Sequence, residues 1–409
     1  MDRPIIQSLL DVDFYKDTMG QLIFHRHAPA PVKLAFRNRH EHIRLADCLD
    51  VAELRENFEH IRSLRFAPRE LQYLAAVRQY DEPMFKPDYI AFLETFRLPE
   101  FHVQARGGDL VMEFFGEWAS VTRWETLALQ AVAELYGEYQ ARGANTAELW
   151  SEGARRLDGK LDAMSANPSI SFSDFGTRRR FSLAWQDYVV SRIAGNPQCR
   201  GTSNTWLAMK YGLTPMGTNA HELPMVYSAI YRREDENAQR LVSSQRVIED
   251  WEAEYGLGLS IFLPDTYGSD YFFNKVVTPR MLQTWKGSRH DSGPPKDYGD
   301  NRIRMYEAAG IDPRQKWIVF ADGLDARLVD ELERYFHGRI QTTFGIGTNL
   351  TNDLGPAPLS IVVKPVEANG LPVAKLSDNI QKASGNPTEL ERIRRLTGYT
   401  GSFSEACRY

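Results

Sequence analysis

The sequence has few cysteines, no long apolar run and no excess of positive charge. Its three cysteines, Cys48, Cys199 and Cys407, are widely spaced and odd in number, which argues against a disulfide framework and favours a reducing compartment. No run of about 18 apolar residues is present, so no membrane-spanning helix is expected. The 49 lysines and arginines against 54 aspartates and glutamates give a net charge of −5, which argues against non-specific nucleic-acid binding. Acidic residues stand where a signal peptide would be cleaved, so we expect a cytoplasmic protein with no membrane or nucleic-acid partner.

The 409 residues suffice for two or three domains, and no internal repeat or low-complexity tract is visible. The first third has an α+β pattern. It begins with a predicted helix that Asp11 or Asp13 caps and that runs through Phe24, and a strand follows in which Val32, Leu34 and Phe36 alternate. Helical patterns broken by prolines are predicted between about residues 52 and 98. A hairpin between 101–106 and 110–115, which turns at Gly107-Gly108, and an amphipathic helix over 126–139 are predicted after them.

From about residue 168 onward, short apolar runs alternate with helical patterns, which is typical of βα units around a parallel sheet. Seven strands are predicted, at 169–172, near Arg200, at 213–216, at 258–263, near Ser288, at 317–320 and at 340–344. The later runs 359–366 and 372–376, joined at Asn369-Gly370, predict a hairpin that returns to the N-terminal domain. The expected domains are therefore an N-terminal α+β domain over 1–140, a barrel domain over 141–356, and a C-terminal hairpin and tail over 357–409.

A polar segment with glycines follows almost every predicted strand, and in a βα barrel such segments meet on one face. They bring arginines, carboxylates, a histidine and several glycine loops to one mouth, which suits an anionic, polyhydroxylated ligand. The segments are 174–180, 201–204, 216–222, Asp265, 289–293, 321–323 and 345–348.

Glycine loops and arginines in these segments predict an anion site. Gly323 and the Gly345-x-Gly347-Thr348 loop follow the last two barrel strands, where backbone N–H groups can approach a phosphate, although such glycines also serve tight turns. The run 178–180 consists of three adjacent arginines, which cannot all point the same way. We expect one or two of them to reach the ligand and the others to form ion pairs, unless the run is a solvated helix face.

Two carboxylates and one histidine are candidates for the chemistry. Asp291 is suited to binding ribose hydroxyls, with Arg289 on a neighbouring anionic group. Asp265 either adds a second carboxylate to the sugar or to Mg²⁺ that accompanies a pyrophosphate, or caps a helix. His221 follows a predicted strand end and precedes Glu222, which can orient its ring, and local spacing leaves a catalytic role and an ordinary packed role equally open. No HExxH pair or Cys/His cluster exists, so no tightly bound zinc is expected.

In these segments and in others, the chain resembles the bacterial nicotinate phosphoribosyltransferases of the type II phosphoribosyltransferase family. The resemblance is carried by seven ordered motifs: LLDVDFYK at 9–16, DFGTRRRFS at 174–182, GTSN at 201–204, TPMGT with AHE within 214–222, RHDSG at 289–293, FGIGT at 344–348 and VAKLSD at 373–378. It implies an α/β fold, an irregular seven-stranded α/β barrel with an N-terminal α/β sandwich domain. It also implies a homodimer whose active sites lie at the subunit interface.

The implied reaction converts nicotinate and phosphoribosyl pyrophosphate to nicotinate mononucleotide and pyrophosphate in NAD salvage. The resemblance couples it to ATP hydrolysis through a phosphohistidine, matched by His221, with Mg²⁺ as cofactor. By the same matching, Phe175 and the partner subunit's Tyr15 sandwich the pyridine ring, and Arg178 meets the carboxylate or a phosphate.

The implied site is large. His221 and Asp291 are expected to be catalytic, no metal is expected to be tightly bound, and Mg²⁺ is expected to enter with the substrate near Asp265. The expected substrate-binding residues are Tyr15, Phe175, Arg178, Thr202, Ser203, Asp265, Arg289, Ser292, Gly293, Asp322, Gly323, Gly345, Gly347 and Thr348.

Substrate preference is predicted from Ser203. The related nicotinamide phosphoribosyltransferases carry Asp at the matching position, where it accepts from the amide, whereas a serine can donate to the carboxylate of nicotinate. We therefore expect acid over amide, with an amide-using transferase as one alternative. A non-catalytic sugar-phosphate-binding regulator is another, because Pro294 stands where the family motif continues with Asp. The family's usual Ser-Asp-Asn is also replaced, by Ala-Asp-Gly at 321–323.

Overall fold

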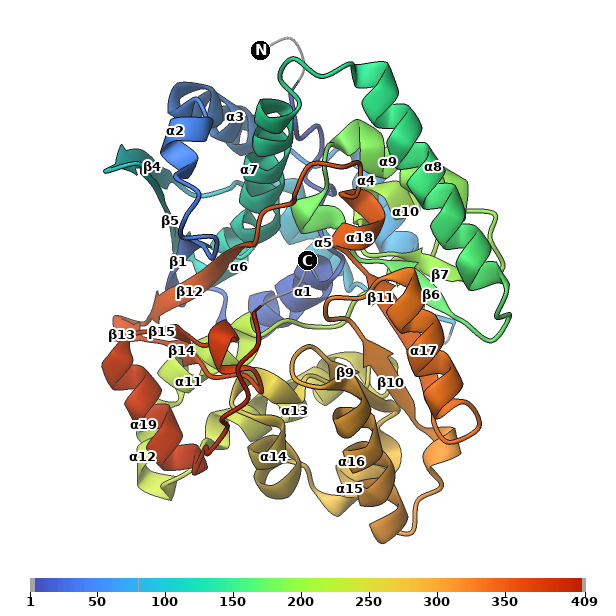
Figure 1. The fold of residues 1–409 in the computed structure, drawn as a ribbon. Coiled ribbons are helices and arrows are strands. Elements are labelled where there is room, and N and C mark those ends of the chain that lie inside the picture. Colours follow the sequence, from blue (N-terminus) through green and yellow to red (C-terminus); the bar gives the residue numbers. More distant parts are fainter. Residues whose placement is uncertain (1–3, 80, 407–409) are drawn as a thin grey trace.

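Two separate sheets organise the molecule, which is described by a computed structural model over residues 4–79 and 81–406 (Figure 1). The first sheet is antiparallel, with the order β13 (Leu371–Pro372), β12 (Ile361–Ala368), β1 (Pro31–Asn38), β5 (Asp109–Glu117) and β4 (Phe101–Arg106). The second is parallel, with the order β7 (Cys199–Thr202), β6 (Phe172–Asp174), β11 (Gln341–Ile346), β10 (Trp317–Phe320), β9 (Gly287–His290) and β8 (Ile261–Phe262). The mixed α/β class predicted from the sequence is confirmed.

The antiparallel sheet has its two predicted hairpins. The β4–β5 hairpin turns at residues 107–108, and the β12–β13 hairpin turns at Asn369 and Gly370, whose φ angles are 50° and 71°. Positive φ at both central residues is the geometry for which an Asn-Gly pair is favoured. Along β1, Val32 and Leu34 are buried, as their alternation predicts, while Phe36 is half-buried.

A C-terminal strand lies beside an N-terminal one in this sheet. Figure 1 shows β12, in red, next to β1, in blue, and the two pair in antiparallel register from Val32↔Ala368 to Asn38↔Ile361. The sheet therefore needs residues from both ends of the chain. The domain boundaries at 140 and 356 stay a prediction.

The parallel sheet is less regular than a barrel of seven strands. Six of the predicted strands are present, with shifts of a few residues, while the segment around Pro215 is reduced to one parallel bridge with Thr202. No pairing between that segment and β8 is present among the described residues. Closure into a seven-stranded barrel is thus not confirmed.

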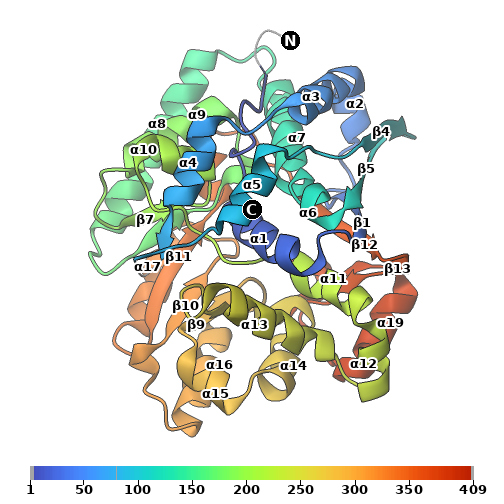
Figure 2. The same cartoon turned by 180° about the vertical axis from the view of Figure 1, so that it is seen from behind.

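Helices cover both sheets (Figures 1 and 2). Those of the N-terminal part are α1 (Tyr15–His27), α2 (Leu45–Cys48), α3 (Val51–Ser63), α4 (Pro68–Ala76), α5 (Pro87–Glu94), α6 (Trp118–Val121) and α7 (Trp124–Gln140). Those that follow are α8 (Thr146–Ser165), α9 (Leu183–Ile193), α10 (Thr205–Tyr211), α11 (Glu222–Ile230), α12 (Arg232–Ala238), α13 (Val242–Tyr255), α14 (Ser269–Tyr271), α15 (Pro279–Thr284), α16 (Pro295–Ala308), α17 (Ala326–Phe336), α18 (Thr348–Thr351) and α19 (Pro387–Thr397). Two short β-ladders, β2 (Arg78–Gln79) with β3 (Glu82–Pro83) and β14 (Ala374–Lys375) with β15 (Ser384–Gly385), complete the elements used below.

Helix α7 differs from its predicted amphipathic character, because every residue from Trp124 to Gly137 is buried. It lies inside the larger of two hydrophobic clusters, which joins the antiparallel sheet to α11 and α13. The smaller cluster fills the other half of the parallel sheet, between its strands and α9, α16 and α17. None of the described helices has the length and apolar character needed to cross a membrane. Cys48 and Cys199 are free thiols, and Cys407 lies outside the described residues.

The N-terminal aspartates do not cap α1 as the sequence predicts. The helix begins at Tyr15 without a side-chain cap, and Asp11 instead forms a bidentate ion pair with Arg180, at 2.7 and 2.9 Å. Asp11 also accepts a hydrogen bond of 2.7 Å from the Asn204 side chain. Both members of the ion pair are almost fully buried, so each charge depends on the other for its stabilisation.

We therefore expect Asp11→Ala to lower the free energy of unfolding by about 3–5 kcal/mol, because it removes the bidentate pair of the buried Arg180 guanidinium and leaves the more distant Glu134 carboxylate, at 3.6 Å. Urea denaturation followed by circular dichroism measures this change. Glu331→Ala is the control, because it removes an exposed ion pair with Lys296 and should cost less than about 1 kcal/mol. Equal losses for the two variants would contradict the structural importance of the buried pair.

Candidate active site

A cavity of about 700 Å³ lies where the parallel strands meet the N-terminal part of the chain. Twelve of the sixteen residues predicted from the sequence line it: Tyr15, Phe175, Arg178, Ser203, His221, Arg289, Asp291, Asp322, Gly323, Gly345, Gly347 and Thr348. The structure thus brings together most of the predicted site in one space. The other four predicted residues, Thr202, Asp265, Ser292 and Gly293, do not line the cavity.

These four residues lie behind the cavity wall and hold neighbouring groups. Thr202 donates a hydrogen bond of 2.8 Å to Asp174, and Ser292 donates one of 2.7 Å to Asp265. The carbonyl of Gly293 lies 2.9 Å from Nε2 of His290. Their partners Asp174, Asp265 and His290 do not line the cavity either, so these four residues belong to the layer behind the lining.

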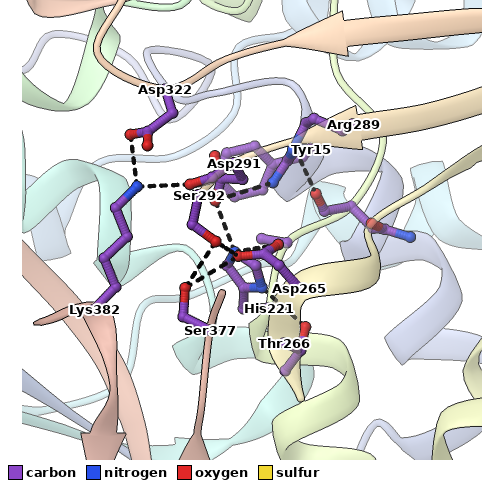
Figure 3. Close-up of polar contacts among 12 residues, drawn as sticks. Tyr15, His221, Asp265, Thr266, Arg289, Asp291, Ser292, Asp322, Ser377 and Lys382 are labelled. Carbon is purple, nitrogen blue, oxygen red and sulfur yellow. Dashed lines mark hydrogen bonds and ion pairs between the residues drawn. The ribbon is translucent and has the colours of Figure 1, made fainter. Parts of the chain in front are cut away.

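His221 stands between two strand ends and has a partner on each ring nitrogen (Figure 3). Its Nδ1 lies 2.9 Å from Oγ1 of Thr266, and its Nε2 lies 2.8 Å from Oδ2 of Asp291. Glu222 does not orient the ring, contrary to the expectation from its position in the sequence. Its carboxylate instead accepts hydrogen bonds from Lys16, at 2.6 Å, and from the Trp118 indole, at 2.7 Å.

Burial and charge determine the protonation of this cluster. Burial, reinforced by the nearby ammonium of Lys375, lowers the pKa of His221 to about 4, so its ring is neutral at neutral pH. Burial alone would raise the pKa of Asp265, but the positive charge of Lys375, together with a hydrogen bond from Ser292, holds that pKa below its usual range. The pKa of Asp291 is likewise held low, because Arg289 outweighs the effect of burial.

The same cluster has the donor set of a divalent cation site. One ligand atom each from His221, Asp265 and Asp291 can be chosen so that the three lie within 4.8 Å of one another. Oδ1 of Asp265 is buried without a hydrogen-bond partner. Mg²⁺ prefers oxygen ligands such as carboxylates. Asp265, through its unpartnered Oδ1, is therefore a residue of this cluster that is able to bind Mg²⁺.

Tyr15 of this chain lines the cavity, and the expectation that a partner subunit supplies a Tyr15 stays a prediction. The preceding residues bind the strand end after β7: the Phe14 amide donates to the Ser203 carbonyl at 2.6 Å, and Asp13 forms a β-bridge with Asn204. The guanidinium of Arg178 lies 5.6 Å from the centre of the Tyr15 ring. One copy of the chain is therefore enough to place Tyr15 beside the other lining residues.

The Ser203 hydroxyl, which is predicted to donate to a ligand carboxylate, donates in this structure to a side chain of the protein. It donates a hydrogen bond of 2.6 Å to Oδ1 of Asp13, whose Oδ2 lies 3.0 Å from Nε of Arg178. Because a hydroxyl has only one proton, Ser203 in this arrangement positions Asp13. Burial raises the pKa of Asp13 despite the opposing charge of Arg178.

The glycines of the last loop make room for Phe175. A Cβ atom on Gly345 would lie 2.2 Å from the Phe175 ring, and one on Gly347 would lie 3.2 Å from the Phe175 carbonyl oxygen. Close packing against an aromatic ring is thus a sufficient reason for glycine at 345. Gly347 and Thr348 still border the cavity, at the start of α18.

The three adjacent arginines divide as expected. Arg178 and Arg179 line the cavity, whereas Arg180 forms the buried pair with Asp11. Arg289 donates a hydrogen bond of 3.1 Å to the Asn219 carbonyl. Asp322 accepts one of 2.6 Å from Lys382 (Figure 3).

Several basic residues at the cavity escaped prediction from the sequence. They are Arg39, Arg200, Lys286, Lys364, Lys375 and Lys382. Lys375 lies within the VAKLSD motif, which could have identified it as a site residue. The other five lie outside the matched motifs. Altogether nine arginines and lysines line the cavity against three aspartates, and this excess of positive charge favours an anionic ligand.

A parallel sheet whose strand ends carry glycine loops, many cations and a neutral histidine between carboxylates defines an enzyme site for a phosphorylated, hydroxyl-rich substrate. The sequence model of the nicotinate phosphoribosyltransferase (NAPRTase) family matches residues 170–399, and that of the NAPRTase N-terminal domain matches residues 10–133. The chain belongs to the nicotinate phosphoribosyltransferase family.

Solved structures agree with this assignment. The nicotinate phosphoribosyltransferase of Porphyromonas gingivalis is 32% identical, with a TM-score of 0.84, and the match covers 97% of this chain and 100% of that one. The nicotinate phosphoribosyltransferase of Vibrio cholerae is also 32% identical, with a TM-score of 0.86 and coverage of 98% and 95%. The likeness therefore extends over both sheets.

The environment of His221 predicts an unusual titration. We expect its NMR titration midpoint near pH 4 and a higher midpoint in Lys375→Met, because that variant removes a positive charge that disfavours protonation. His221→Gln identifies the resonance. Since the unfolded state binds this proton near pH 6.5, the contribution of His221 to stability should decline as the pH falls from about 6.5 to about 4. A midpoint near 6.5 in the wild type would contradict the buried, neutral ring.

Proposed function

We propose that this chain transfers the phosphoribosyl group of phosphoribosyl pyrophosphate to nicotinate in NAD salvage. The bond between C1 of the ribose and the pyrophosphate oxygen breaks, and a bond from C1 to the pyridine nitrogen forms, giving nicotinate mononucleotide and pyrophosphate. The observation that carries the proposal is the cavity that gathers Tyr15, Phe175 and nine basic side chains in a chain of this family.

The chemistry needs charge stabilisation more than proton transfer. The pyridine nitrogen already has a lone pair, so no general base must activate it. The leaving pyrophosphate develops negative charge, and Arg178, Arg289 and Lys382 of the cavity wall can balance that charge. The aromatic rings of Tyr15 and Phe175 favour a flat pyridine ring near the reacting carbon.

Asp265 and Asp291 are the residues that would hold Mg²⁺, since they offer carboxylate oxygens in one cluster and one of those oxygens has no hydrogen-bond partner. When bound, Mg²⁺ supplies positive charge to the pyrophosphate oxygens. Asp291 has a second task in this proposal, because it also holds Nε2 of His221. Thr266, at Nδ1, fixes the other side of the ring.

We propose further that ATP is a co-substrate and phosphorylates His221. Nε2 is the nitrogen directed to Asp291, which lines the cavity, so it is the nitrogen that would receive the γ-phosphoryl group. In the tautomer that carries its proton on Nδ1, which donates to the Thr266 hydroxyl, the lone pair of Nε2 forms the bond to phosphorus and the bond to the ADP oxygen breaks. The low pKa of His221, about 4, which burial causes, supports this role because a neutral ring is the nucleophilic form.

A homodimer with shared active sites and a cytoplasmic location stay proposals derived from the sequence. Light scattering of the purified protein measures the oligomeric state.

The main test supplies purified protein with phosphoribosyl pyrophosphate, Mg²⁺ and either nicotinate or nicotinamide, with and without ATP. We expect nicotinate mononucleotide as the product and a higher rate with ATP, because the family assignment and the basic cavity both favour the acid. Liquid chromatography of the mononucleotides measures both rates. Product from nicotinamide alone would identify an amide-using transferase, and no product from either would indicate a non-catalytic sugar-phosphate-binding protein.

For His221→Ala we expect loss of ATP hydrolysis and of the stimulation by ATP, with some ATP-independent transfer remaining, because only the phosphoryl acceptor is removed. A coupled ADP assay and the mononucleotide assay measure the two activities. His102→Ala, a histidine of the β4 strand away from the cavity lining, is the control and should keep both. Retained ATP hydrolysis in the His221 variant would refute the phosphohistidine.

A further inference from the structure

Lys364 is a basic residue of the cavity that neither the motifs nor the proposed mechanism uses. It lies in β12, opposite Ala35 of β1, and its side chain is only 14% exposed. The same cavity wall carries Tyr15 and Arg178. Because β12 comes from the C-terminal part of the chain, the antiparallel sheet brings this ammonium to residues more than 180 positions away in sequence.

The ammonium of Lys364 has no hydrogen bond within the described part of the chain. Its ion-pair partner there is Oε1 of Glu125, at 3.6 Å, which is too long for a hydrogen bond. Glu125 is also shared with other groups: its Oε2 lies 2.7 Å from Nζ of Lys16 and accepts from the Tyr15 hydroxyl at 3.3 Å. An ammonium has three N–H donors, and leaving them unsatisfied in a largely buried position is costly. The Lys364 ammonium therefore has donors to offer to a ligand in the cavity.

The position of Lys364 favours the pyridine end of the ligand over the sugar phosphates. The charged residues near Lys364 are Glu125, Arg178, Lys375 and Arg39. Of these, Arg178 lies over the Tyr15 ring. Asp322, in the loop after β10, is instead paired with Lys382. The acceptor expected beside Lys364 is thus a substituent of the ring that Tyr15 helps to enclose.

We propose that Lys364 binds the carboxylate of nicotinate and so determines the preference for the acid over the amide. The proposal rests on the proposed function and replaces Ser203 in this role, because the Ser203 hydroxyl already donates to Asp13. A carboxylate forms a charge-assisted hydrogen bond with an ammonium, whereas the neutral amide of nicotinamide does not gain this charge interaction and presents N–H donors that an ammonium cannot accept.

The charge of Lys364 should also make nicotinate binding depend on pH. Burial, together with the positive charges of Arg178, Lys375 and Arg39, lowers the pKa of Lys364 to about 8, although Glu125 opposes this shift. An arriving carboxylate favours the protonated form. The KM for nicotinate should therefore rise as the pH passes above 8, when the free enzyme loses the proton.

The test compares Lys364→Met and Lys364→Arg with the wild type, with KM and kcat measured separately for nicotinate and for phosphoribosyl pyrophosphate. For Lys364→Met we expect the KM for nicotinate to rise about 10- to 100-fold, since a hydrogen bond to a charged group is lost. The KM for phosphoribosyl pyrophosphate should change less than about twofold. Lys364→Arg should recover much of the nicotinate affinity and remove the rise of KM between pH 7.5 and 9, because arginine stays protonated there.

Lys33→Met is the matched control, because Lys33 lies in the same sheet but pairs with Glu113 at 2.7 Å and does not line the cavity. An unchanged KM for nicotinate in Lys364→Met, or a rise confined to phosphoribosyl pyrophosphate, would overturn the proposal. Circular dichroism of each variant establishes that it is folded.

Calorimetric titration of nicotinate and nicotinamide into the same proteins tests the assignment of Lys364 separately from the proposed transferase function. If the wild type forms no mononucleotide, the proposed function fails. The Lys364 assignment then still stands or falls on whether nicotinate binds the wild type more tightly than it binds Lys364→Met, with nicotinamide affected equally little in both.

Discussion

The architecture depends on finding a partner for every buried charge of the segment that opens the chain. Between residues 11 and 17 the sequence places three aspartates and one lysine, all nearly inaccessible to water. Charges in such a position are tolerated only when they are paired and hydrogen-bonded. Asp11 meets Arg180, Asp17 meets Arg123, and Lys16 lies between Glu125 and Glu222. These partners come from α7, from the loop after β6 and from the start of α11, so satisfying the charges holds both sheets against one segment.

The same pairing constructs the active site. The backbone that delivers Asp11 and Asp17 to their partners also fixes Tyr15 and Asp13 between them, and Asp13 in turn holds Arg178 and Ser203. Glu222, which neutralises Lys16, is the neighbour of His221, so the position of the histidine is tied to the same network. A site assembled from strands, an N-terminal segment and a C-terminal hairpin therefore does not rely on loop flexibility for its geometry.

Much of this could be predicted from sequence, and the failures have a common cause. Local signals identified the Asn369-Gly370 turn, the β4–β5 hairpin and most of the strands, because turn chemistry and alternation act over a few residues. Family motifs identified twelve cavity residues. Local reasoning did not identify the residues to which three acidic side chains are hydrogen-bonded. Asp11 and Asp13 have the sequence pattern of helix caps, and Glu222 has the pattern of a residue that orients His221. Each of them instead binds a group far away in sequence. Lys364 was missed because strand pairing alone brings it to the cavity.

The charges buried between the two sheets and the charges of the cavity lining are related. In the wall between the sheets nearly every charge has a close opposite partner, which stabilises the fold in the absence of ligand. The cavity lining also contains ion pairs, such as Arg178 with Asp13 and Lys382 with Asp322, but its nine cations outnumber its three aspartates, and mutual repulsion among the cations disfavours the empty state. A polyanionic substrate removes that repulsion while a neutral molecule of the same shape does not, so affinity and selectivity for anions arise from one imbalance. The buried pairs allow the imbalance to persist, because they fix the backbone that the cavity cations would otherwise push apart.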